Sequence, residues 1–245
     1  MIRSARGIVS RVTEIDPSVW QRYGVLARLA RRHPACATSL PPGRVELHPL
    51  LEAGEHPWML VDPGEVQCSY EAAVVDGRIP VREASWHDVF NVLAFVRFPR
   101  AKASLHARVL ERQRERLRTG TRMRSREEDA LTLLDEAVIV IAGPAEGLAR
   151  LDEIRPSHDL ARIEACIRVQ SLCAVVFGHA LLEHLVYDRP QIGAGVLTLA
   201  LPDAVTPSLQ AIDACLARTI VEGRLEQPTF APTLSWPATV HAWCR

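Results

Sequence analysis

Apolar residues recur at helical spacing in the stretch that follows Ser85. Positions i, i+3, i+4 and i+7 of this stretch carry one apolar stripe, formed by Trp86, Val89, Phe90 and Leu93. Such a stripe is typical of a helix that buries one face. Ser85 precedes it as an N-cap, and Asp88 stands three residues later, which is the spacing of a capping box. The pattern therefore predicts a helix that begins directly after Ser85.

The same periodicity predicts helices in the remainder of the chain. Pro99 ends the helix after Ser85 and, because proline suits a first helical turn, opens a second one that we expect to run to about Leu117. Thr206 is the expected cap of the last helix. The further helices that we expect are residues 17–33, 145–154, 161–170, 179–187 and 207–222.

Short apolar runs predict strands. Residues 131–134 and 138–142 favour a hairpin or two adjacent strands, although Asp135-Glu136-Ala137 between them lacks the Asn-Gly turn signal. Carboxylates at this place are typical of strand ends that face water, but carboxylate pairs, here with Asp129, also bind divalent cations or serve as acid and base. Residues 195–201 predict a further strand. Residues 171–177 before Gly178 fit either a strand or the start of one continuous buried helix.

Two segments lack a regular period. Residues 35–80 are rich in proline and glycine, which indicates irregular structure with one or two short strands or helices on the core. Residues 226–245 contain prolines and two tryptophans and are expected to pack across the core. Together the patterns predict an α+β fold: a helix-rich single globular domain, residues 1–245, with a small mixed or antiparallel sheet.

Composition excludes several classes of protein. The chain has 245 residues, 48% of them hydrophobic, and its 29 basic and 29 acidic residues balance, so no overall field favours nucleic acid or a membrane surface. Six cysteines without a Cys-x-x-Cys pair predict reduced, mostly buried thiols. No apolar run reaches the ~20 residues of a membrane span and no secretory signal is recognisable, so we expect a cytoplasmic protein without membrane contact. Glycine-rich phosphate loops, G-x-S-x-G elbows and dinucleotide fingerprints are missing. The sequence carries no signal for an oligomeric state.

The helix after Ser85 carries the first candidate site residues, His87, Asp88 and Asn91. His87 and Asn91 are four positions apart and therefore share one helical face. An imidazole beside an amide and a carboxylate binds a metal, orients a water or moves a proton near neutral pH. The same residues also suit a structural role, in which Asp88 caps the helix and the other two bind a neighbouring loop.

A second candidate lies after Gly178, where His179 and Glu183 are again four positions apart. The H-x-x-x-E spacing suits zinc or iron, provided that a third ligand comes from elsewhere in the chain. If residues 171–177 are a strand, Gly178 permits a sharp turn that presents His179 at the strand's carboxyl end. The alternative is that both side chains form hydrogen bonds within the core.

A basic run occupies residues 97–126, which contain eleven lysines and arginines but only two acidic residues, Glu111 and Glu115. Arginine presents a fork of donors that fits phosphate oxygens. We therefore expect the compact group at its start to bind an anionic substrate; this group is Arg97, Arg100 and Lys102. Residues 108–126 are interpreted as a solvated arm, with nucleic-acid contact as the alternative.

Seven short motifs occur in order along the chain. They are Tyr70-Glu71, residues 77–80, residues 86–91, residues 98–103, residues 129–133 with Asp135-Glu136, and residues 177–183. The ordered set resembles a bacterial family catalogued as domain of unknown function 3025, over about residues 70–201. The resemblance implies no known fold or reaction; residues 1–69 precede this core as an N-terminal helix and irregular segment. The chain departs from the family pattern at His106, at Ala137-Val138 and in its shorter carboxyl-terminal tail.

These observations lead to one working hypothesis. We expect a hydrolase or phosphoryl-handling enzyme with an anionic substrate, assisted by a divalent metal of unspecified identity. Its site requires the two imidazoles to lie within about 12 Å of each other. The side chains expected in one cleft are His87, Asp88, Asn91, His179 and Glu183, with Glu183 orienting an imidazole or ligating. The alternatives are a non-catalytic nucleic-acid or anion-binding protein that uses residues 97–126, and a small-molecule binding or assembly protein.

Overall fold

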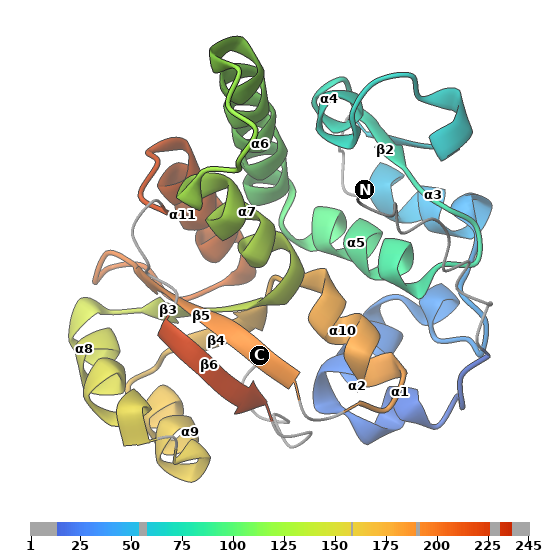
Figure 1. Ribbon diagram of the computed structural model, residues 1–245. Coiled ribbons are helices and arrows are strands. Elements are labelled where there is room, and N and C mark those ends of the chain that lie inside the picture. Colours follow the sequence, from blue (N-terminus) through green and yellow to red (C-terminus); the bar gives the residue numbers. More distant parts are fainter. Residues whose placement is uncertain (1–13, 54–57, 158, 190–191, 226–230, 237–245) are drawn as a thin grey trace, which may run out of the picture.

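The main sheet of the computed structural model is mixed and has the strand order β4-β3-β5-β6 (Figure 1). The structure describes residues 14–53, 58–157, 159–189, 192–225 and 231–236. β3 pairs parallel with β5 and antiparallel with β4, and β6 pairs antiparallel with β5, while β1 and β2 form a separate parallel ribbon. The strands are β1 (Met59–Val61), β2 (Arg78–Pro80), β3 (Val138–Gly143), β4 (Cys173–Val176), β5 (Ile192–Ala200) and β6 (Ala231–Trp236).

Helices cover both faces of this sheet (Figure 1). The helices are α1 (Val19–Arg22), α2 (Gly24–Arg32), α3 (Arg44–Glu52), α4 (Tyr70–Val75), α5 (Trp86–Arg97), α6 (Pro99–Thr119), α7 (Arg126–Ala137), α8 (Ala145–Ile154), α9 (Leu160–Val169), α10 (His179–Val186) and α11 (Leu209–Val221). Short 3₁₀ turns occupy Pro34–Cys36, Pro63–Glu65 and Arg155–Ser157. The protein is a helix-rich α+β domain, as predicted, and its main sheet is mixed.

Alternation along β3 divides the interior into two hydrophobic cores. Successive side chains of a strand point to opposite faces, so Ile139 and Ile141 enter one core while Val138 and Val140 enter the other. The first core also holds the apolar sides of α2, α5 and α10, and the second holds those of α6, α7 and α11. All six residues of β3 are buried. The candidate site lies where the helices of these two cores meet at one end of β3.

One predicted element is wrong: residues 131–134 are not a strand. They belong to α7, which begins with a capping box. The Ser125 hydroxyl accepts from the Glu128 backbone amide, and the Glu128 carboxylate accepts from the Ser125 backbone amide. Leu131 and Leu134 lie three positions apart on one buried face of this helix. The capped helix supplies its own backbone hydrogen bonds, so only residues 138–143 remain for a strand. No hairpin forms between 131–134 and 138–142.

Other boundaries differ in detail from the predicted ones. The extended backbone of Tyr23 divides the first predicted helix into α1 and α2. Ser208, and not Thr206, caps α11 through its hydroxyl. The capping box predicted at Ser85 is only half formed: its hydroxyl accepts from the Asp88 backbone, but the Asp88 carboxylate binds Arg82. Helices α5, α6, α8 and α9 match the predicted ranges within two residues.

The segment before Gly178 takes the strand alternative, because β4 ends at Val176 and α10 begins at His179. Residues 231–236 of the predicted tail form the edge strand β6, and Trp243 lies outside the described residues. Five of the six cysteines are described, and all five are free thiols, but only Cys36 and Cys166 are buried, so the expectation of mostly buried thiols is wrong for the described cysteines. None of the described helices is both long and apolar enough to cross a membrane.

Candidate active site

Gly178 places His179 at the junction between α7 and β3. A side chain at this position would collide with the backbone of Glu136, Ala137 and Val138, so only glycine permits the close approach. The Phe177 and Gly178 amides both donate to the Val138 carbonyl, at 3.1 and 2.9 Å. This turn therefore fixes the first residue of α10 against the last turn of α7.

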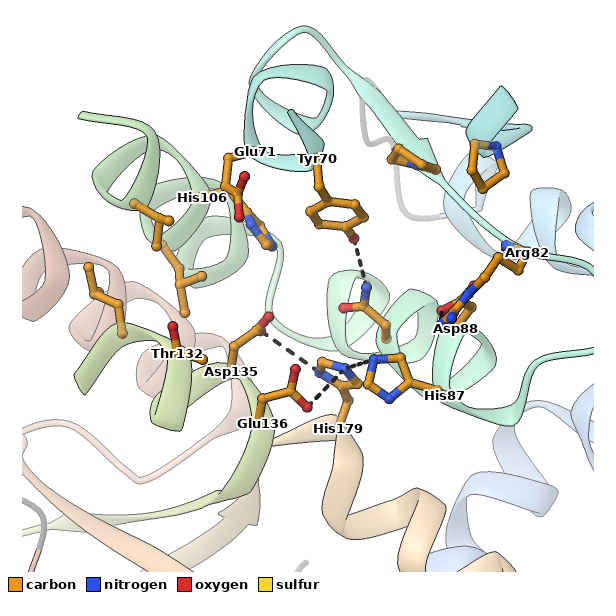
Figure 2. Close-up of a pocket in the computed structure, with 16 residues that line it drawn as sticks. Tyr70, Glu71, Arg82, His87, Asp88, His106, Thr132, Asp135, Glu136 and His179 are labelled. Carbon is orange, nitrogen blue, oxygen red and sulfur yellow. Dashed lines mark hydrogen bonds and ion pairs between the residues drawn. The ribbon is translucent and has the colours of Figure 1, made fainter. Parts of the chain in front are cut away.

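The imidazoles of His87 and His179 meet in this space (Figure 2). Their Nε2 atoms are 3.0 Å apart, and the ring centroids are separated by 4.4 Å with the planes inclined at 72°. His87 comes from the first turn of α5, and His179 begins α10. The requirement that the two imidazoles lie within about 12 Å is met.

Carboxylates surround this pair of imidazoles. Glu183 Oε2 lies 3.0 Å from His87 Nδ1, and Glu136 Oε2 lies 3.7 Å from His179 Nε2. Asp135 Oδ1 lies behind His179, 3.9 Å from its Nδ1. One ligand atom each from His87, Glu136 and His179 falls within 4.8 Å of the others, so these three side chains together form a group able to hold a metal ion.

A buried network supports the carboxylate side of the site. The ammonium of Lys102, which is fully buried, forms an ion pair with Asp135 and donates to Asn91 Oδ1 at 2.8 Å. Asn91 Nδ2 in turn donates to the Tyr70 hydroxyl at 2.7 Å. The ammonium also lies 4.6 Å from the centre of the Phe95 ring. Lys102 is therefore a charge partner within the protein and not, as its sequence position suggested, a group presented to an anionic substrate.

The environment moves the pKa values of the two imidazoles in opposite directions. The hydrogen bond to Glu183 raises the pKa of His87, whereas burial lowers the pKa of His179 to about 4. Burial raises the pKa of Glu136. For Asp135 burial acts in the same upward direction, but the Lys102 ammonium outweighs it and holds the pKa of Asp135 well below its usual range. At neutral pH His179 is consequently a neutral imidazole beside an ionised Asp135.

The two histidines line a cavity of about 370 Å³ between α4, α5, α6 and α7. Its walls include Tyr70, Arg82, Asp88, Asn91, His106 and Glu136 (Figure 2). Arg82 is largely exposed, and its guanidinium binds the Asp88 carboxylate at 2.8 Å. Arg82 is thus an exposed cation of the lining, whereas His179 is a buried part of it.

The structure brings most of the predicted site residues together, but not all. His87, Asp88, Asn91 and His179 line one cavity, and Glu183 lies directly behind His87. Arg97 and Arg100 are not among the described residues that line it; Arg100 is exposed at the start of α6, where its backbone amide donates to Asp213. The predicted group of three cations therefore does not form.

From the sequence, a cation-binding or acid-base role of Asp135 and Glu136 was only the alternative to a structural one. Asp135 and Glu136 were placed in a strand turn, where carboxylates face water, because α7 was not recognised. The signal that identifies α7 is Ser125 with Glu128 three residues later, the capping box that the structure contains. Both acids lie in the last turn of this helix, which ends at residue 137, and their carboxylates lie beside His179.

Much of the basic run is neutralised within the pair of helices α6 and α7. Arg108 and Arg112 contact Glu127, Arg116 contacts Glu128, and Arg124 contacts Asp129. Glu127 and Glu128 are buried under these arginines. Four exposed arginines have no ion pair among the described residues; they are Arg114, Arg118, Arg122 and Arg126. The positive charge available to a partner is thus smaller than the sequence count suggests.

Comparison with known proteins yields one match. The model of a protein family described as "Protein of unknown function (DUF3025)" matches residues 61–234, which include every residue of the cavity. No curated protein and no solved structure matches the chain.

Proposed function

The chain belongs to the DUF3025 family of proteins of unknown function, and we propose that it is a metal-assisted hydrolase. The observation that carries the proposal is the group of His87, Glu136 and His179 at the cavity wall, in which one ligand atom from each side chain lies within 4.8 Å of the others and the two imidazole Nε2 atoms are 3.0 Å apart. Two histidines and one carboxylate are the ligand set of several catalytic zinc sites, and they leave further coordination positions for water and substrate.

The spacing of the imidazoles suits shared coordination. Nitrogens bound at 2.0–2.1 Å and separated by 90–110° around an ion are about 2.8–3.4 Å apart. The observed Nε2 to Nε2 distance of 3.0 Å falls within this interval. The Glu136 oxygen, 3.7 Å from His179 Nε2, requires only a small side-chain movement to complete the set.

The hydrogen bonds behind the histidines also suit this role. Glu183 accepts from Nδ1 of His87, which leaves the Nε2 lone pair directed at the proposed ion. In His179 the buried Nδ1 has no hydrogen-bond partner among the described residues, while Nε2 contacts His87. Binding of a cation at Nε2 would place the ring proton on Nδ1, facing the Asp135 carboxylate at 3.9 Å.

His87, Glu136 and His179 would hold the ion, and a divalent ion bound there would supply the Lewis acidity that hydrolysis near neutral pH requires. Glu183 and Asp135 orient the imidazoles, and Lys102 keeps Asp135 ionised. Arg82 at the open side is the cation best placed to meet a negative group of a substrate. The proposal does not retain Arg97 or Arg100 as substrate ligands.

The test is metal binding by the chelator-treated full-length protein. Titration calorimetry with Zn²⁺, Mn²⁺ and Mg²⁺ is expected to give one site per chain, with a preference for the transition ions because two ligands are imidazoles. His179→Ala and Glu136→Gln should lose the site. His184→Ala, on an exposed neighbouring histidine of the same helix, should keep it.

Activity is measured with chromogenic p-nitrophenyl phosphate and p-nitrophenyl acetate, before and after metal is restored. Hydrolysis of either ester that is lost with chelator, regained with metal and unchanged in His184→Ala supports the proposal. Equal metal content in the wild type and His179→Ala, or hydrolysis that is indifferent to both chelator and variant, would overturn it.

A further inference from the structure

His106 is buried in the cavity wall without any hydrogen bond. Its relative exposure is 3%, and neither ring nitrogen has a partner among the described residues. A buried polar group without a partner costs free energy, so proteins rarely keep one that has no role. The position of this ring therefore requires an explanation that the metal site does not supply.

Neighbouring aromatic rings fix the orientation of His106. It stacks on Phe95, with centroids 5.4 Å apart and planes inclined at 8°, and meets the edge of Tyr70 at 5.4 Å. Tyr70 is itself held through Asn91, which accepts from buried Lys102. Such a rigid arrangement is what a binding site needs in order to present a donor and an acceptor in a defined direction.

The cavity that His106 lines holds apolar side chains as well as the proposed metal ligands. The lining of this cavity includes the apolar side chains of Leu105, Val109 and Leu131. Tyr70 and Glu71 lie close to His106 in the same view (Figure 2). The charge of Lys102, the nearby cation, is already paired with the Asp135 carboxylate. Arg82, the cation of the described lining, lies on the exposed side and is paired with Asp88. An anionic group beside His106 would therefore meet the carboxylates of Glu71 and Asp135 without an unpaired cation from the described lining.

The imidazole of His106 is uncharged. Burial, together with the positive charge of Lys102, lowers its pKa to about 3. A neutral imidazole offers one N–H donor and one lone-pair acceptor. This combination matches a carboxamide or similar uncharged group, which also has one of each.

We propose that His106 is a specificity-determining residue that hydrogen-bonds an uncharged, amide-like group on an apolar part of the substrate. The reaction at the other end of the cavity rests on the proposed function, but the subsite itself needs no metal. Binding of such a group would satisfy the ring nitrogens that are unpaired in the described structure. The substrate class is accordingly a molecule with a hydrolysable group at one end and a compact apolar body with a neutral polar group at the other.

The probes are benzamide, benzoate and benzylammonium, which share a ring and differ in charge. Each is titrated into chelator-treated full-length protein and followed by calorimetry and by the ¹⁵N signals of the histidine side chains. Benzamide is expected to bind best and to shift the His106 signal. His106→Phe keeps the stacked ring without its nitrogens and should bind benzamide about 10-fold more weakly, whereas His106→Gln, which retains a donor and an acceptor, should recover most of the affinity.

Several results would overturn the subsite. They are no measurable benzamide binding, equal benzamide affinity in wild type and His106→Phe, and tighter binding of benzoate or benzylammonium than of benzamide. Melting temperatures establish that each variant is folded, and His106→Gln provides the comparison if the phenylalanine variant is not. The His179→Ala variant separates the two proposals, because it should lose metal but bind benzamide as the wild type does.

Discussion

The Nε2 atoms of His87 and His179 lie 3.0 Å apart, although 92 positions separate the two residues in the sequence. His87 is held from behind by Glu183, which follows His179 by one turn of α10. Helix α10 thus supplies one imidazole of the pair and the carboxylate that orients the other. A change in the packing of α5 against α10 would therefore disturb both histidines at once.

Replacement of Glu183 by glutamine should weaken metal binding without removing a ligand. The amide keeps the shape but loses the negative charge that holds the Nδ1 proton of His87. Loss of such an orienting partner typically costs 10–100-fold in metal affinity. Calorimetric titration of Zn²⁺ into Glu183→Gln, with His184→Ala as the control on the same helix, measures this effect. An unchanged dissociation constant would argue against an orienting role.

Replacement of Lys102 by methionine should destabilise the protein strongly. The variant leaves the Asp135 carboxylate without its buried partner, and breaking a buried ion pair in this way costs about 3–5 kcal/mol. Urea unfolding of Lys102→Met measures the loss. The double variant Lys102→Met with Asp135→Asn removes the uncompensated charge and should recover part of it. A double variant as unstable as the single one would show that packing, and not charge, is the main role of the lysine.

His106 should make the protein sensitive to acid. Its pKa of about 3 in the folded chain lies below the ordinary value of 6.5, so the unfolded chain takes up a proton first as the pH falls. Above pH 6.5 the neutral ring of His106 costs no free energy of unfolding. From pH 6.5 toward pH 3 the free energy of unfolding falls progressively, by about 2–3 kcal/mol at pH ~4.5. The difference in unfolding free energy between wild type and His106→Phe, measured from pH 7 to pH 4.5, isolates this group from the titrating carboxylates. A difference that does not change with pH would contradict the buried, neutral state of the ring.

The arm formed by α6 and α7 should bind nucleic acid weakly. Four of its arginines are paired with acids, and four exposed ones remain, namely Arg114, Arg118, Arg122 and Arg126. Four phosphate contacts correspond to a slope of about −3.6 in a plot of log K against log salt. Fluorescence anisotropy with a short DNA duplex at several salt concentrations measures the slope. The double variant Glu127→Gln, Glu128→Gln should steepen it by releasing the paired arginines; a wild-type slope near −8 would favour the nucleic-acid alternative.

The periodic patterns determined much of the helical structure. Helices α5 and α6 follow directly from the apolar stripe after Ser85 and from Pro99, because capping and the loss of a backbone donor are local effects. Helix α7 was predicted as a strand because Leu131 to Leu134 is a short apolar run, and such a run alone does not distinguish the two structures. The half-formed box at Asp88 differs for another reason, since Arg82 competes for its carboxylate.

For the site, the sequence by itself identified His87, Asn91, His179 and Glu183 as candidates from their four-residue spacings on two helices. Only the tertiary structure showed that these two helices face each other, and that the end of α7 adds Glu136 and Asp135 to the same place. It also decided the part played by Lys102, because burial turns a basic residue of a charged run into the internal partner of Asp135. The physical reason is the range of the interactions. Spacing on one helix is encoded within a few residues, whereas the meeting of α5, α7 and α10 depends on how two hydrophobic cores pack against β3.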